Sequence, residues 1–150
     1  MIYWDTSCVI KLYTAESDSS VWQRLAVDVP GDRASSALLE AELAFALRQK
    51  ELRGEVVPGG AAALLRIFRN DVTAGRFVLF PLGADVIRRA AALADEAAAL
   101  RPPCPLRTLD GLHLATAVIL RCNRIATTDT RMKAGAQLLG IPVVSTEAVT

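Results

Sequence analysis

Residues 1–13 read MIYWDTSCVIKLY, and in them a short apolar run leads directly into an aspartate. We expect a buried strand at Ile2–Trp4, which is followed at once by Asp5, Thr6 and Ser7. A carboxylate at the end of a buried strand is poorly solvated, which costs free energy unless another group compensates its charge. Asp5 therefore raises a question that the rest of the chain must answer, namely which partner or cation stabilises it.

The composition is that of a globular protein. Of the 150 residues, 52% are hydrophobic and 22% are charged, and the formal net charge is +1. A chain of this length and composition predicts one domain over residues 1–150 with a core of its own. A net charge this close to zero does not indicate a nucleic-acid-binding protein, so the partners must be inferred from particular residues.

Cysteine and histidine are too scarce for several kinds of site. Cys8, Cys104 and Cys122 are widely spaced and form no C-x-x-C pair, which argues against a disulfide framework or a cysteine zinc site. We expect free thiols in a reducing compartment. His113 is the only histidine, so a histidine-rich zinc site is excluded, and a Ser-His-Asp triad would need this residue. Neither a signal peptide nor an apolar run of ~18 residues is visible, so we expect a cytoplasmic protein without a membrane span.

Strand-like and helix-like segments alternate along the chain. The expected strands are Ile2–Trp4, Arg76–Leu82, Arg124–Asp129 and a last one at residues 141–145. Helices are expected at Ser19–Val27, Gly60–Val72 and Asp85–Leu100. A further helix is capped by Ser35 or Ser36 and ends near Leu52, before Gly54. Two more are expected late in the chain, one with Thr108 as its N-cap and one at residues 131–140 closed by Gly140. Pro30-Gly31 is expected to break the chain. This alternation predicts an α/β fold, a three-layer sandwich with a central, mostly parallel sheet flanked by helices.

Four carboxylates occupy positions where acids are unusual. Asp5 and Asp129 each end an apolar strand, so they share one rim of the sheet if the two strands are neighbours. Asp110 lies in the first turn of an otherwise apolar helix. Glu42 has larger apolar neighbours one helical turn away than Glu40 has, so Glu42 is the better candidate for a partly buried acid.

Carboxylates gathered in a partly dry site repel one another. Two unit charges ~4 Å apart cost about 4 kcal/mol at an effective dielectric near 20. Either some of the acids are protonated or a cation lies among them, and ligands that are all oxygen select Mg²⁺ or Mn²⁺ rather than zinc. Each acid taken alone also fits a structural role, as a turn residue, a helix-dipole residue or an exposed helix carboxylate.

Taken in order, these segments resemble a known family. DTSCVIKLY (5–13), SSALLEAELAFAL (35–47), LDGLHLATAVIL (109–120) and IATTDTRM (125–132) resemble the four signatures of PIN domains, and most of all those of the VapC-type toxin ribonucleases of bacterial toxin–antitoxin pairs. The resemblance implies a metal-dependent endoribonuclease that hydrolyses phosphodiester bonds in RNA, with Mg²⁺ or Mn²⁺ as its cofactor. It also implies two protein partners, a cognate antitoxin and a second copy of the chain in a homodimer.

The resemblance also implies roles for individual residues. It makes four acids the ligands of the metal: Asp5, Glu42, Asp110 and Asp129. Thr6 or Ser7 would supply a hydroxyl that orients Asp5 or a water on the metal. Gly111 departs from the alanine expected after the third acid, which weakens the helix by up to roughly 1 kcal/mol but removes no ligand.

Residues near the acids admit a functional and a structural interpretation. Four basic side chains could meet phosphates or could be solvated surface charges: Arg101, Arg107, Arg131 and Lys133. His113 lies one helical turn from Asp110, and we expect it to be a half-buried packing residue rather than a member of the site. The stripe Leu64, Leu65, Ile67 and Phe68 is more apolar than one helix face needs, and the resemblance suggests a dimer face or an antitoxin groove near it.

Two other functions remain open from the residues alone. One is a phosphoryl-transfer domain with an aspartate nucleophile at Asp5, although such phosphatases would want a second aspartate where this chain has Ser7. The other is a PIN-like scaffold that binds without catalysis, against which the complete set of acids argues.

Overall fold

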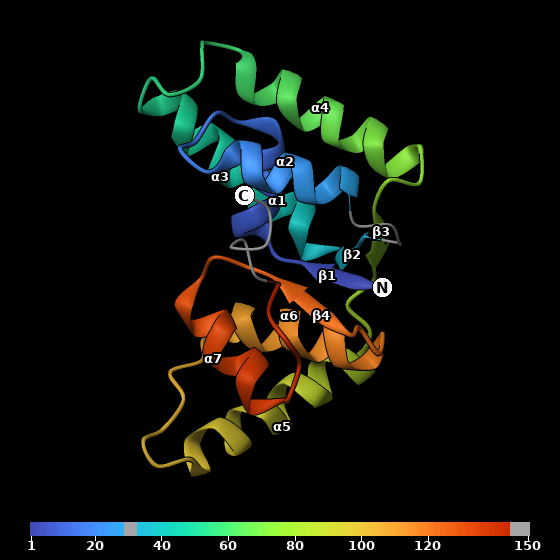
Figure 1. Cartoon of the computed structure of the whole chain (residues 1–150), viewed down its shortest axis with the longest axis vertical. Coiled ribbons are helices and arrows are strands. Elements are labelled where there is room, and N and C mark those ends of the chain that lie inside the picture. Colours follow the sequence, from blue (N-terminus) through green and yellow to red (C-terminus); the bar gives the residue numbers. More distant parts are fainter. Residues whose placement is uncertain (29–32, 145–150) are drawn as a thin grey trace.

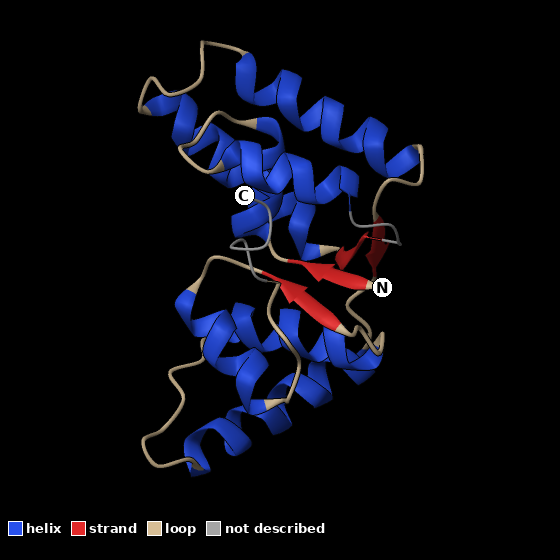
Figure 2. Cartoon of the chain, in the orientation of Figure 1, coloured by secondary structure: helices blue, strands red, loops and turns tan. Residues whose placement is uncertain are grey.

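The computed structural model of the chain describes residues 1–28 and 33–144, and its sheet lies between two layers of helices (Figure 1). The strands are β1 (Ile2–Trp4), β2 (Arg33–Ser36), β3 (Val78–Phe80) and β4 (Arg124–Ala126). The helices are α1 (Thr6–Tyr13), α2 (Ser19–Asp28), α3 (Leu38–Leu52), α4 (Gly60–Thr73), α5 (Ala84–Ala99), α6 (Thr108–Ile119) and α7 (Thr130–Leu138). The predicted three-layer α/β sandwich is confirmed, with α1–α4 on one side of the sheet and α5–α7 on the other (Figures 1 and 2).

The sheet is parallel throughout, with the strand order β3-β2-β1-β4. The first strand therefore lies at the centre, where Tyr3 pairs with Ala34 of β2 on one side and with Ile125 of β4 on the other. Because the strands are parallel, their carboxyl ends meet at one edge of the sheet, which is where ligands bind in open α/β folds. Asp5 and Asp129 thus follow neighbouring strands, which is the condition under which the sequence placed both acids on one rim of the sheet.

Each face of the sheet has its own core. Successive residues of a strand point to opposite faces, and the two aromatic residues of β1 follow this rule. Trp4 packs in the cluster built with α1, α2, α3 and α4, whereas Tyr3 packs in the cluster built with α5, α6 and α7. Both side chains are almost fully buried. The central strand is consequently held from both sides, which fixes the position of the aspartate that follows it.

The strand β2 was not predicted, and it corrects the expected cap of α3. Ser35 and Ser36 lie in this strand, and Ala37 takes the N-cap position of α3, although the Ser36 Oγ still accepts a hydrogen bond from the Leu38 N–H at 3.2 Å. The segment has the sequence RASS, which contains no β-branched or aromatic residue. It is a strand because it pairs with both β1 and β3, so tertiary pairing outweighs weak local propensity.

Two more boundaries differ from the prediction. Thr108 is the first residue of α6 rather than its N-cap, a position that Arg107 takes. Residues 141–144 form a single bridge, between Ile125 and Val143, instead of a last strand, because Pro142 has no N–H to donate to a ladder. Residue 145 of that expected strand and the expected break at Pro30-Gly31 lie outside the described residues.

The remaining expectations for the fold are largely met. The other predicted strands and helices are present with boundaries shifted by a few residues, and α1 is an addition. The three cysteines are free, and Cys8 and Cys122 are buried. No helix in the described parts of the chain is long and apolar enough to cross a membrane.

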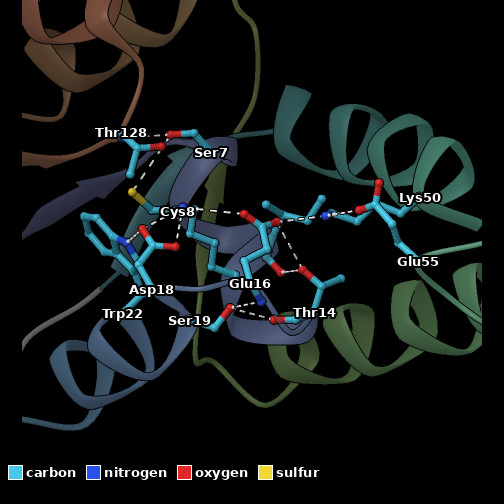
Figure 3. Close-up of polar contacts among 12 residues, drawn as sticks. Ser7, Cys8, Thr14, Glu16, Asp18, Ser19, Trp22, Lys50, Glu55 and Thr128 are labelled. Atoms are coloured by element: carbon cyan, nitrogen blue, oxygen red, sulfur yellow. Dashed lines mark hydrogen bonds and ion pairs between the residues drawn. The ribbon is translucent and has the colours of Figure 1, made fainter. Parts of the chain in front are cut away.

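An ion-pair network fastens the segment after α1. Lys11 Nζ contacts both carboxylate oxygens of Asp18, at 2.6 and 2.7 Å, and Lys50 Nζ contacts Glu16 Oε1 at 3.0 Å. Asp18 also accepts the indole N–H of Trp22 at 3.1 Å (Figure 3). The network joins α1, α2 and the end of α3, so these two lysines are engaged in structural contacts.

Candidate active site

All four predicted acids line one cavity at the carboxyl edge of the sheet. The cavity has a volume of about 400 Å³ and is lined by Asp5, Thr6, Ser7, Glu42, Arg107, Thr108, Leu109, Asp110, His113, Asp129, Arg131 and Met132. The acids come from four places in the chain, namely the end of β1, the first half of α3, the first turn of α6 and the residue before α7. Parallel strand ends and two helix starts converge here, so the fold brings together residues that are more than a hundred positions apart.

Asp5 is stabilised by two hydroxyl groups. Its Oδ2 accepts a hydrogen bond of 2.6 Å from Ser7 Oγ and one of 2.8 Å from Thr127 Oγ1, and the residue is only 6% exposed. Asp5 occupies the N-cap position of α1, yet its side chain makes no capping hydrogen bond. The alternative of a simple turn or cap residue therefore does not account for this carboxylate.

The direction of both hydroxyl groups is set by the backbone after β4. Ser7 Oγ accepts the Thr128 N–H at 3.0 Å, and Thr127 Oγ1 accepts the Asp129 N–H at 3.1 Å (Figure 3 for Ser7 and Thr128). Because each oxygen already accepts a backbone N–H, its own proton is free to point at Asp5. Thr127 was not among the predicted residues, and its position two residues before Asp129 is the only sequence signal that could have suggested it.

Glu42 is held by a chain of buried groups. Its Oε2 accepts a hydrogen bond from Thr6 Oγ1 and lies 2.7 Å from His113 Nε2, while His113 Nδ1 lies 2.6 Å from the Tyr3 hydroxyl. That hydroxyl also accepts the backbone N–H of Ser36 at 3.0 Å. This series of hydrogen bonds runs from β2 through β1 and α6 to α3, so the position of Glu42 depends on four separate elements.

The histidine and the glutamate shift each other's ionisation. Burial alone would raise the pKa of Glu42, but the hydrogen bonds and charge of His113 together with Thr6 hold it below its usual value. Burial alone would lower the pKa of His113, but the Glu42 carboxylate, with smaller contributions from Asp5 and Asp110, keeps it above its usual value. The prediction that His113 is only a packing residue is therefore wrong, since this buried side chain pairs with Glu42 and lines the cavity.

Asp110 and Asp129 share one arginine. Arg131 Nε lies 3.2 Å from Asp110 Oδ2, and Arg131 Nη2 lies 3.1 Å from Asp129 Oδ2. Each acid also has a structural contact: Asp110 Oδ2 accepts the Arg107 N–H at 2.9 Å, and Asp129 Oδ1 caps α7 through the N–H groups of Arg131 and Met132. The helix-start role considered for Asp110 and the turn role considered for Asp129 thus coexist with a place in the cavity.

The other predicted basic residues divide between site and surface. The guanidinium of Arg107 makes no hydrogen bond or ion pair within the described residues, and this residue lines the cavity. Arg101 instead donates to the carbonyl groups of Ala98, Ala99 and Leu100, and Lys133 is not part of the lining. Two of the four candidates, Arg107 and Arg131, are therefore placed where they can meet a phosphate.

The carboxylate oxygens that line the cavity are chemically suited to a hard divalent cation. In the part of the chain that the structure describes, Oδ1 of Asp5, Oε1 of Glu42 and Oδ1 of Asp110 accept no hydrogen bond, so carboxylate oxygens remain available. Oxygen ligands of this kind suit Mg²⁺ and Mn²⁺. As they stand, however, no three His, Cys, Asp or Glu side chains of residues 1–28 and 33–144 lie close enough together to hold an ion.

The chain is similar in sequence to known proteins over most of its length. The model of the PIN domain family matches residues 2–138. Ribonuclease VapC46 of Mycobacterium tuberculosis is 36% identical over 146 residues, covering 96% of each chain, and Ribonuclease VapC35 of the same species is 32% identical over 154 residues, covering 97% of this chain and 96% of the relative.

Solved structures share the fold at low identity. The chain is similar to a toxin–antitoxin complex from Klebsiella pneumoniae with a TM-score of 0.68 and 19% identity, covering 97% of this chain and 98% of that one. It is also similar to Mycobacterium tuberculosis VapC20, described as a toxin that cleaves the sarcin-ricin loop, with a TM-score of 0.66 and 15% identity, covering 89% of this chain and 94% of that one.

Proposed function

The chain belongs to the PIN domain family, and from this premise we propose that it is an endoribonuclease, the toxin of a toxin–antitoxin pair, that uses a divalent metal ion. The observation that carries the proposal is the cavity that Asp5, Glu42, Asp110 and Asp129 line together. The curated relatives covered over almost their whole length are named ribonucleases, which supports RNA as the substrate.

The four acids are the residues that would hold the metal, which is Mg²⁺, with Mn²⁺ as a substitute. When bound, the ion offsets the charge of the phosphate and of the acids and lowers the pKa of water. The chain supplies no activated side-chain nucleophile in the cavity, since the polar part of the lining is made of acids, hydroxyls, two arginines and a histidine paired with Glu42. Hydrolysis by water is therefore the reaction that the site supports.

The remaining residues of the cavity orient the acids and the substrate. Ser7 and Thr127 hold the Asp5 carboxylate in one orientation, and Thr6 and His113 do the same for Glu42. Arg107, whose guanidinium is not engaged with another described residue, is the residue that we assign to the phosphate beside the scissile bond. Single-stranded or loop RNA is the proposed target because its backbone and bases can be splayed into a pocket.

The protein partners are proposed from exposed apolar surface. Phe45 of α3 is 75% exposed and Ile67 of α4 is 47% exposed, whereas Phe68 is fully buried in the core. The predicted apolar stripe of α4 therefore divides, and only part of it is available to a partner. We assign a cognate antitoxin and a second copy of the chain to the exposed apolar surface of the molecule.

The test is an RNA cleavage assay on the purified chain with Mg²⁺ and with EDTA, comparing wild type with Asp5→Asn. Asp95→Asn, a change of an exposed acid on α5, is the matched control. We expect wild type and Asp95→Asn to cleave RNA only when Mg²⁺ is present. We expect Asp5→Asn not to cleave RNA, although its thermal stability should equal or exceed that of wild type. Normal cleavage by Asp5→Asn would refute the assignment of the site.

Two further results would favour the other functions. Trapped phosphate on Asp5 would indicate an aspartate nucleophile. Calorimetry that detects no binding of Mg²⁺ or Mn²⁺, together with no cleavage, would indicate a binding scaffold.

A further inference from the structure

Arg131 occupies the position between two of the proposed metal ligands. Its Nε lies 3.2 Å from Asp110 Oδ2 and its Nη2 lies 3.1 Å from Asp129 Oδ2. From this bridge we propose that Arg131 competes with the divalent cation for Asp110 and Asp129, so that guanidinium and metal ion alternate at these acids. The inference rests on the proposed function, because it concerns the same site.

Both carboxylate oxygens of Asp129 already have partners. Oδ1 accepts the backbone N–H groups of Arg131, at 2.7 Å, and Met132, at 3.3 Å, and these bonds cap α7. Oδ2 is the only oxygen left for an ion, and it contacts the Arg131 guanidinium. For Asp129 to become a metal ligand without uncapping the helix, Arg131 must give up this oxygen.

The acids of the cavity therefore fall into two pairs. In the described part of the chain neither Asp5 nor Glu42 contacts an arginine, because their partners are hydroxyl groups and a histidine. Oδ1 of Asp110 also accepts no hydrogen bond there, so at Asp110 the competition concerns Oδ2 alone. Asp110 and Asp129 instead share a permanent positive charge, since a guanidinium does not lose its proton in proteins. The arginine neutralises the second pair when no ion is bound, which reduces the repulsion among four carboxylates.

Release of the arginine costs little. Its side chain is 32% exposed, and ion pairs with that much access to water are weak and screened by salt. A divalent ion next to the same oxygens repels the guanidinium, so the two cations exclude each other. Arg131 lies in the first turn of α7 and lines the cavity. A displaced guanidinium therefore stays beside the site, where an RNA phosphate can accept its hydrogen bonds.

The experiment is a calorimetric titration of the full chain with Mn²⁺, without RNA, for wild type, Arg131→Met and Lys133→Met. Methionine keeps an unbranched apolar stem and removes the charge. Lys133 is an exposed residue of the same helix outside the cavity, so Lys133→Met controls for the loss of one positive charge. We expect the Kd for Mn²⁺ to fall about tenfold in Arg131→Met and to stay at the wild-type value in Lys133→Met.

A gain in affinity separates competition from damage to the fold, because a distorted site would bind the ion more weakly. In cleavage assays at saturating Mg²⁺, we expect Arg131→Met to raise KM for RNA more than it lowers kcat, and Arg131→Lys to lie between it and wild type in both Kd and KM.

Two outcomes overturn the inference in different ways. If wild type binds Mn²⁺ and cleaves RNA but Arg131→Met binds the ion with the wild-type Kd or more weakly, the competition is refuted and the proposed function stands. If wild type neither binds Mn²⁺ nor cleaves RNA, both are refuted.

Discussion

Removing the hydroxyl group of Tyr3 tests whether the buried chain behind Glu42 is as specific as the structure indicates. Tyr3→Phe keeps the ring, which packs edge-on against the His113 ring at a centroid distance of 5.9 Å, and deletes only the oxygen. That oxygen lies 2.6 Å from His113 Nδ1 and accepts the Ser36 N–H at 3.0 Å. All three residues are at least 98% buried, so water cannot replace the lost partner.

The expected cost follows from the two groups that lose a partner. A buried donor or acceptor without a hydrogen bond costs about 1–3 kcal/mol, so Tyr3→Phe should lower the free energy of unfolding by about 2–4 kcal/mol. The control is Tyr13→Phe, the same change at the other tyrosine. Its hydroxyl donates at 2.7 Å to Asp71, which keeps Arg76 as an ion-pair partner, so we expect a loss of about 0.5–1.5 kcal/mol.

The assay is urea unfolding at neutral pH with EDTA, followed by circular dichroism, and RNA cleavage by the same proteins. We expect a lower midpoint at unchanged slope for Tyr3→Phe. We also expect slower cleavage, because His113 is then less firmly placed against Glu42. A Tyr3→Phe protein that loses no more stability than Tyr13→Phe would refute the claim that this hydroxyl serves two buried partners.

Three further outcomes concern the acids. Asp5→Asn should raise the free energy of unfolding in EDTA by on the order of 1 kcal/mol, measured by urea titration, because one of four like charges is removed while an amide oxygen can still accept both hydroxyl hydrogen bonds. In EDTA, the His113–Glu42 pair should stabilise the fold most between the ordinary pKa values of 4.5 for Glu42 and 6.5 for His113. The pKa of His113 is raised, so its contribution is complete below pH 6.5 and is lost as pH rises through the raised value. The pKa of Glu42 is lowered, so its contribution is lost as pH falls through the lowered value. Thermal melts of wild type across pH should show both limbs. In Glu42→Gln the loss of stability at high pH should be smaller, because burial then opposes the raised pKa of His113 without its main partner. Mn²⁺ at 100 times its Kd should add about 2.7 kcal/mol to the free energy of unfolding of wild type, reversed by EDTA, and should add nothing to Asp5→Asn if that substitution abolishes binding.

Much of the fold could be predicted because its signals are local. The apolar run of β1 and the helical spacing in α4 and α5 are visible in short windows, and the elements lie where the patterns place them. The strand β2 has no such signal, since RASS becomes a strand only through pairing with β1 and β3.

The four acids that line the cavity could be predicted from the sequence, and their hydrogen-bond and ion-pair partners much less so. Four carboxylates in apolar settings are conspicuous in a sequence, because burying a charge is costly and needs a reason. His113, by contrast, lies in a helix whose apolar pattern equally suits a packing residue. The interpretation as a packing residue was wrong because its two partners, Tyr3 and Glu42, are 110 and 71 positions away in the sequence.

The sequence by itself determined which residue types are present and which stand beside strand ends, since backbone preference and burial act over a few neighbouring positions. Only the tertiary structure decided that Thr127 donates to Asp5, that His113 pairs with Glu42 and that Arg131 bridges Asp110 and Asp129. Hydrogen bonds and ion pairs depend on distances of about 3 Å in space. Those distances are set by the way parallel strands and helix starts converge at one edge of the sheet, which no short stretch of the chain encodes.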